Sequence, residues 1–199
     1  MRFKTILASV APAAILLFSG RGLVAQVAPA AKVGGLPIGI SVGVSDYDID
    51  YGPDRRMQGL VARAGVGLFH GLGVDFGART IFMNTPSGIT RMQQTTYLAG
   101  AFYESPGIWR LRPFARFGGG IGVIEFPSNN PLYTRDSYVV YAPSGGAEYP
   151  ITPKVFVRAE YEYQYWRQYH GQHDLTPSGY TVGVTYYMRP RRLRPHELN

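Results

Sequence analysis

The chain has 199 residues, of which 17% are charged, with 25 glycines, 15 tyrosines and no cysteine. The lack of cysteine excludes disulfide bonds and thiolate metal sites. The formal charge of +7 comes mainly from the two ends, because residues 26–188 carry 13 basic and 12 acidic side chains. This near balance excludes the concentrated basic stripe that nucleic-acid binding requires, so no nucleic-acid partner is expected.

Residues 1–25 are predicted to be a cleavable signal peptide. Arg2 and Lys4 form a positive start, residues 6–18 are apolar and uncharged, and small residues follow. The apolar run is shorter than the roughly 20 residues of a transmembrane helix, which favours export over a membrane anchor. Cleavage is placed after Ala25, and two further alanines within the next five residues are alternatives.

Eight segments downstream have the period-two hydrophobic pattern of β-strands, and none has a convincing helical period. They lie at about 36–46, 57–69, 72–83, 94–104, 111–124, 137–149, 154–167 and 178–188. The connections alternate between short turns, at 70–71, 105–107 and 150–153, and longer loops, at 47–56, 84–93, 125–136 and 168–177. An even number of strands with short turns at one end is typical of an outer-membrane barrel, with the short end in the periplasm.

The two faces of these strands indicate which side meets the membrane. In the seventh segment Val155, Val157 and Ala159 share one face, and Arg158 and Glu160 lie on the other. Pooling the charged faces of all segments gives Arg63, Asp75, Arg79, Arg112, Arg116, Glu148, Arg158, Glu160 and Glu162. Such a balanced set is tolerated away from water only when it is paired, so we predict an ion-pair network that fills the interior of the barrel.

Two points about the faces remain open in the sequence. A soluble eight-stranded barrel is the alternative, and it would place its apolar residues inside, around a small ligand. The segment 94–104 has no assigned orientation, because Tyr97 and Ala99 alternate with Leu98 and Phe102. Aromatic residues near predicted strand ends are expected to form interface girdles, and they are Trp109, Tyr141, Tyr149, Tyr163, Trp166 and Tyr186.

Three aspartates, at the end of the first strand segment and in the loop that follows it, are candidates for a metal site. Asp46, Asp48 and Asp50 have the spacing of the start of an EF-hand, but Tyr51 and Met57 replace the required glycine and glutamate. A divalent cation shared with lipopolysaccharide phosphates is the looser possibility, and a solvated loop is the alternative.

Histidines in the last long loop raise the possibility of an enzyme. His170 and His173 lie near Glu162 and Asp174, and outer-membrane lipid A deacylases use a His-Ser-acid arrangement on a barrel of this size. That family has a serine two residues after the histidine, where this chain has Gln172. We therefore expect surface histidines, no enzymatic activity and no cofactor.

Three strands carry a family resemblance. The segment 112–123, with its Arg-Pro-aromatic start and alternating glycines, and the segments 145–149 and 158–163 resemble consecutive strands of small outer-membrane barrels. The resemblance is to the opacity-type family and to the transmembrane domain of outer membrane protein A, and it covers most of residues 36–188. It implies an all-β, eight-stranded, antiparallel up-and-down transmembrane barrel over residues 26–188 in the bacterial outer membrane.

The last strand resembles the terminal β-signal that the barrel-assembly machinery recognises. Its alternate residues are Tyr180, Val182, Val184, Tyr186 and Met188. Two departures from the family are Met188 in place of a final phenylalanine and a basic extension over residues 189–199, which we expect to be solvated.

The resulting functional hypothesis is an integral outer-membrane barrel with a structural or surface-interaction role. Its partners are outer-membrane lipid and lipopolysaccharide, and the assembly machinery during biogenesis. The partner of the loops is unknown. A lipid-modifying hydrolase that uses the rim histidines, or a secreted soluble ligand-binding barrel, is the alternative.

Overall fold

The computed structural model describes residues 36–50, 55–83, 92–125, 135–169 and 173–191. The predicted signal peptide and residues 192–199 lie outside this part. The strands are β1 (Ile38–Asp48), β2 (Arg56–Phe69), β3 (Leu72–Met83), β4 (Gln93–Glu104), β5 (Arg112–Glu125), β6 (Arg135–Pro150), β7 (Val155–Tyr163), β8 (Tyr165–Tyr169), β9 (His173–Leu175) and β10 (Ser178–Tyr187). The described residues contain no helix long and apolar enough to cross a membrane.

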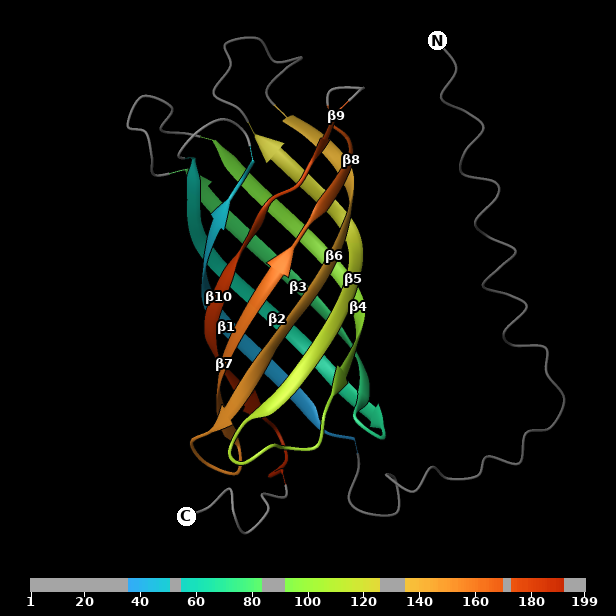
Figure 1. Ribbon diagram of the computed structural model, residues 1–199, viewed down its shortest axis with the longest axis vertical. Coiled ribbons are helices and arrows are strands. Elements are labelled where there is room, and N and C mark those ends of the chain that lie inside the picture. Colours follow the sequence, from blue (N-terminus) through green and yellow to red (C-terminus); the bar gives the residue numbers. More distant parts are fainter. Residues whose placement is uncertain (1–35, 51–54, 84–91, 126–134, 170–172, 192–199) are drawn as a thin grey trace, which may run out of the picture. The chain divides into compact units, whose positions relative to one another are not determined.

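Eight of these strands close into an antiparallel barrel (Figure 1). Strands β1 to β7 pair with their sequence neighbours, and β10 pairs with both β7 and β1. The predicted seventh strand is interrupted at Gln164, so β8 continues it by pairing with β6 and with β9. The predicted fold is confirmed, with strand bounds within two residues elsewhere.

The two ends of the barrel differ. The end that carries the β2–β3, β4–β5 and β6–β7 connections is called the turn end, and the opposite end, where β8 and β9 extend the wall, the loop end (Figure 1). At the turn end His70 and Gly71 form a two-residue hairpin with φ of 50° and 83°. Both residues are in the left-handed region, as a type I′ turn requires, and this turn fixes the register of β2 against β3.

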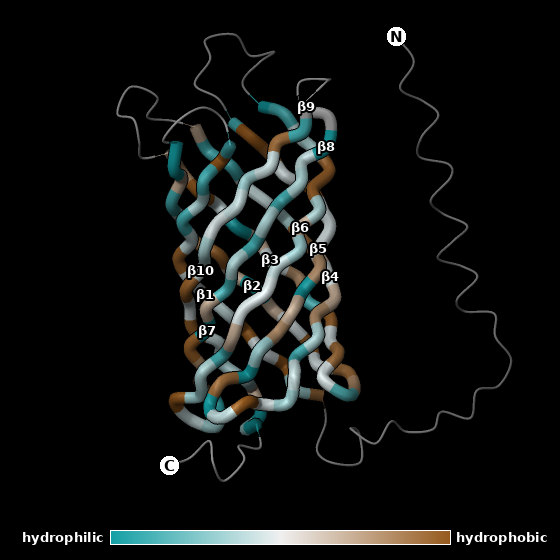
Figure 2. Tube along the Cα trace, in the orientation of Figure 1, coloured by the Kyte–Doolittle hydropathy of each residue, from teal (hydrophilic) through white to brown (hydrophobic). Residues whose placement is uncertain are grey.

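The outer face of the barrel is apolar and the inner face is polar through the middle of the strands. Val42 and Leu60 are 59% and 68% exposed, whereas Arg63 and Asp75 are buried. Hydrophobic and hydrophilic residues alternate along the strands (Figure 2). This arrangement overturns the soluble-barrel alternative, which needs the apolar residues inside.

The structure also orients the strand that the sequence left open. In β4 Tyr97 is 48% exposed and Leu98 is 2% exposed. Gln94, Thr96 and Glu104 share the inward face with Leu98. Strand β4 therefore adds polar groups to the interior as its neighbours do.

Val42→Arg is expected to destabilise the barrel folded in lipid by about 2–4 kcal/mol, because Val42 lies on the outward face in the middle of β1. Denaturant titration in phospholipid bilayers measures this. Asp48→Arg, on the same face but at the loop end of β1, is the control and should cost about 0–1 kcal/mol. Equal costs at the two positions would contradict the assigned lipid-facing band.

Candidate functional site

All nine charged residues predicted for the interior point inward and lie together. Eight of them are buried, and Arg158 is partly buried. They come from β2, β3, β5, β6 and β7, because inward positions recur every second residue along each strand. The interior charge network is therefore present as a geometric feature of the barrel.

Glu162 is the centre of the network on the loop-end side. Its carboxylate lies 2.7 Å from Arg79 Nη2, 3.4 Å from Arg116 Nη1 and 3.7 Å from Arg63 Nη2. Gln164 Nε2 also donates to Glu162 Oε1 at 2.7 Å. Arg116 Nε in turn donates to both oxygens of Asp75, at 2.9 and 2.7 Å. One carboxylate thus receives three guanidinium groups from three different strands.

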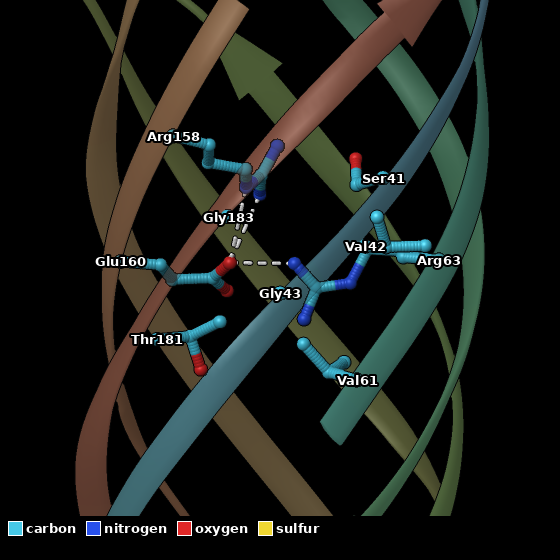
Figure 3. A pocket seen from close by; sticks show the side chains of 9 residues that line it. All are labelled: Ser41, Val42, Gly43, Val61, Arg63, Arg158, Glu160, Thr181 and Gly183. Atoms are coloured by element: carbon cyan, nitrogen blue, oxygen red, sulfur yellow. Dashed lines mark hydrogen bonds and ion pairs between the residues drawn. The ribbon is translucent and has the colours of Figure 1, made fainter. Parts of the chain in front are cut away.

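Arg158 connects this cluster to the turn end, because it pairs with Glu160 and with Glu148; Figure 3 shows Arg158 and Arg63 on the two sides of Glu160. Glu160 Oε2 accepts hydrogen bonds from Arg63 Nη1 at 2.5 Å and from Arg158 Nη2 at 3.1 Å. Arg158 Nη1 reaches Glu148 Oε1 at 3.2 Å, and its guanidinium stacks 3.7 Å from the Phe114 ring centroid. The network is therefore continuous along the barrel axis.

A small cavity of about 20 Å³ lies beside this connection, between β1, β2, β7 and β10 (Figure 3). Its size suits a single water molecule. Arg63 Nε and Glu160 Oε1 are buried without a hydrogen-bond partner, and both residues line the cavity. This cavity thus leaves room for a single water molecule between Arg63 and Glu160.

At the turn end the structure adds Arg191 and Glu104, which the sequence analysis missed. Arg191 Nη1 lies 2.6 Å from Glu104 Oε1 and 3.0 Å from the Tyr187 hydroxyl. Burial opposes the charged form of the Arg191 guanidinium, but Tyr187 and Glu104 outweigh it, so the pKa of Arg191 lies above its usual value. The expectation that residues 189–199 are solvated is therefore wrong for Arg191, which enters the barrel.

The loop end of the interior is apolar, which the sequence analysis also missed. The buried cluster there comprises Tyr47, Ile49, Met57, Ile81, Met83, Met92, Leu98, Ile124, Val140, Ala142, Trp166 and Leu175. Trp166 is 0% exposed and donates from Nε1 to Gln164 Oε1 at 2.8 Å, so its assignment to an outer girdle is wrong. Among the other girdle candidates, Trp109, Tyr141, Tyr163 and Tyr186 are exposed, and Tyr149 is only partly exposed.

The candidate metal ligands are engaged with protein groups. Asp46 pairs with Arg56 Nη2 at 3.0 Å, Asp48 Oδ1 accepts from the Asp50 amide at 3.1 Å, and Thr176 donates to Asp50 at 2.5 Å. Within the described ranges no three His, Cys, Asp or Glu side chains are grouped to hold a metal ion.

The histidine candidates are only partly covered by the structure. His170 lies outside the described residues, and His173 is described as part of the β9 backbone. Asp174 is exposed and accepts a hydrogen bond from the Tyr165 hydroxyl.

The residues of the predicted β-signal lie on one face. Tyr180, Val182, Val184, Tyr186 and Met188 are all exposed on the outer surface. The Met188 amide donates to the Ile38 carbonyl at 3.0 Å, which extends the contact between β10 and β1. Their recognition by the assembly machinery stays a prediction.

Comparisons with known proteins place this geometry among membrane barrels. Residues 11–187 match the family model described as the outer membrane protein beta-barrel domain. No curated protein sequence matches the chain.

Solved structures with a similar fold include three bacterial surface proteins. Neisserial surface protein A has a TM-score of 0.56 at 14% identity, covering 76% of this chain and 96% of that one. The attachment invasion locus protein Ail of Yersinia pestis has a TM-score of 0.54 at 17% identity, covering 77% and 97%. A major outer membrane protein of Thermus thermophilus has a TM-score of 0.51 at 13% identity, covering 76% and 99%. At these identities the likeness establishes the fold.

Proposed function

Because the chain belongs to the outer membrane protein beta-barrel domain family, we propose that it is a closed outer-membrane barrel with a structural or surface-interaction role. Its interior serves to hold the wall together, and solutes do not pass through it. The loop-end rim and the lipid-facing wall are the surfaces that remain available for partners.

The inward side chains at three levels of the barrel are the observation that supports this proposal. Apolar side chains around Trp166 fill the loop end, the Glu162 cluster fills the middle, and Arg191 with Tyr187 occupies the turn end. An eight-stranded barrel has an interior just wide enough for side chains to fill, so side chains at three levels support an interior without a continuous water path of solute width. A general diffusion pore would need charged groups along an open wall.

The outer surface supports the expected lipid partners. A continuous apolar wall fits hydrocarbon, and exposed aromatic residues such as Tyr163 and Tyr180 fit the interface with polar headgroups. Arg56 and Arg135 are exposed rim cations that pair with Asp46 and Glu125, and they would be candidates for contact with lipopolysaccharide phosphates. Recognition of a further surface partner would fall to the loops at this end. No contact within the described residues favours the hydrolase alternative.

Purified protein reconstituted into planar bilayers should give no steady conductance of the size of a wide pore. The physical reason is that ions would have to cross both the apolar loop end and the paired charges. A general porin reconstituted in the same membranes is the positive control, and swelling of protein-containing liposomes in sugar solutions is a second measurement. Stable large conductance, with sugars entering the liposomes, would refute the closed-barrel function.

A further inference from the structure

The segment after the last strand turns back across the turn end of the barrel. The Arg191 amide donates to the Pro153 carbonyl at 2.8 Å, which attaches the segment to the β6–β7 connection. The Arg191 side chain is partly buried, and its guanidinium lies 4.6 Å from the Tyr187 ring centroid and 6.0 Å from that of Phe156. Backbone and side chain are thus held by separate elements of the barrel.

The position of Arg191 is defined by two acidic residues from different strands. Glu104, at the end of β4, lies 2.6 Å from Arg191 Nη1, and Glu148, near the end of β6, lies 3.9 Å from it. Arg191 follows β10, which lies four strands away from β4 in either direction around the eight-stranded barrel, so its contact with Glu104 crosses the opening. An interaction that spans the opening narrows it.

Arg191 contributes to the balance of charge in the opening. Glu104 also pairs with Arg112 Nη1, at the longer distance of 3.8 Å. Glu148 accepts from the Tyr187 hydroxyl at 2.8 Å and shares Arg158 with Glu160. Without Arg191 the opening would hold two carboxylates with fewer cations to balance them, and water would be drawn in to solvate them.

We propose that residues 189–191 form a strap that closes the periplasmic opening of the barrel, with Arg191 as its locking side chain. The strap closes the interior from the turn end, as the apolar cluster does from the loop end. The inference rests on the proposed closed-barrel function, and it assigns the turn-end closure to one residue beyond the last strand.

Thiol accessibility tests the strap directly, because the chain has no cysteine of its own. Thr185 is buried inside the barrel and donates to Glu148 Oε1 at 3.3 Å, so Thr185→Cys places a thiol behind Arg191. A small cationic methanethiosulfonate should label this thiol slowly in folded protein in micelles. Adding Arg191→Gln should raise the labelling rate about tenfold or more, since the opening loses its bridging cation. Arg189→Gln is the matched control, because Arg189 is exposed two residues earlier, and it should leave the rate unchanged.

A second measurement separates an ionic lock from a general effect of the tail. If Arg191 acts by bridging the acidic pair, Glu104→Gln should recover part of the thermal stability that Arg191→Gln loses. Equal labelling rates with and without Arg191 would overturn the strap while leaving the closed barrel intact. Fast labelling of Thr185→Cys while Arg191 is still present, together with bilayer conductance, would instead refute the closed-barrel function itself. Additive stability losses in the double variant would overturn the ionic lock.

Discussion

Glu162→Gln is expected to destabilise the folded barrel by about 3–5 kcal/mol, the usual effect of removing one partner from a buried ion pair. Glu162 is the carboxylate on which Arg63, Arg79 and Arg116 converge. The amide keeps the shape of the side chain but leaves three buried guanidinium groups short of one negative charge. Denaturant titration in phospholipid bilayers measures the loss. On a denaturing gel, the unheated folded band should disappear at a lower temperature than in wild type.

A matched control and a double-mutant cycle define this effect. Glu125→Gln removes a partly exposed rim carboxylate that lies 3.6 Å from Arg135, and surface pairs contribute about 0–1 kcal/mol. Arg79 is the natural cycle partner, because its Nη2 donates to Glu162 at 2.7 Å while Nε and Nη1 are buried without partners. Arg79→Gln combined with Glu162→Gln should cost less than the sum of the single changes. A Glu162→Gln loss no larger than that of Glu125→Gln would show that the network does not contribute to stability.

The strands of the barrel wall could be predicted from the sequence because the alternation of apolar and polar residues depends only on neighbours within one strand. A strand with lipid outside and a polar interior alternates between apolar and polar residues, and Val157 to Tyr163 does so at every residue, whereas Phe156 is an apolar residue on the inward face. The nine charged interior residues were predicted from the same alternation, since each lies on the face of its strand opposite the apolar face. Their pairing distances did not follow, because those depend on the register between strands that are far apart in sequence.

Strand β4 shows where a periodic signal was present but was not used to orient the strand. Gln94, Thr96 and Glu104 share one parity, and together they mark the inward face. Leu98 and Phe102 lie on that same face, and a count of apolar residues alone conceals the polar set. Weighting the polar residues, which are costly on a lipid face, would have oriented the strand and added Glu104 to the interior.

The apolar loop end and Arg191 had no comparable signal. Ile81 and Met83 point inward while Phe82 points outward, so both faces of β3 are apolar there and alternation vanishes. Arg191 lies after the last strand, where no periodicity applies. Its neighbours in sequence include Arg189, Pro190 and Arg192, a basic stretch that is typical of a solvated tail. Only the three-dimensional approach of Glu104 and Glu148 identifies its role.

Removal of residues 188–199 is expected to abolish insertion into the outer membrane, because Met188 completes the outward apolar series that begins at Tyr180. It also removes the hydrogen bond from the Met188 amide to Ile38, at the seam between the first and last strands. We expect the folded, heat-modifiable protein in isolated outer membranes to fall about tenfold or more, with unfolded protein degraded or left in the periplasm. Membrane fractionation with boiled and unboiled gel samples measures both species.

Removal of residues 189–199 alone separates recognition of the last strand by the assembly machinery from closure of the turn end by Arg191. This shorter truncation keeps Met188 and the β10 seam but removes Arg191. It should therefore insert at near wild-type levels and then match Arg191→Gln in its lowered thermal stability and faster thiol labelling. If both truncations lose insertion, and lose it equally, then residues beyond Met188 belong to the assembly signal. If both insert normally, the outward series from Tyr180 to Met188 is a lipid-facing wall and carries no signal for assembly.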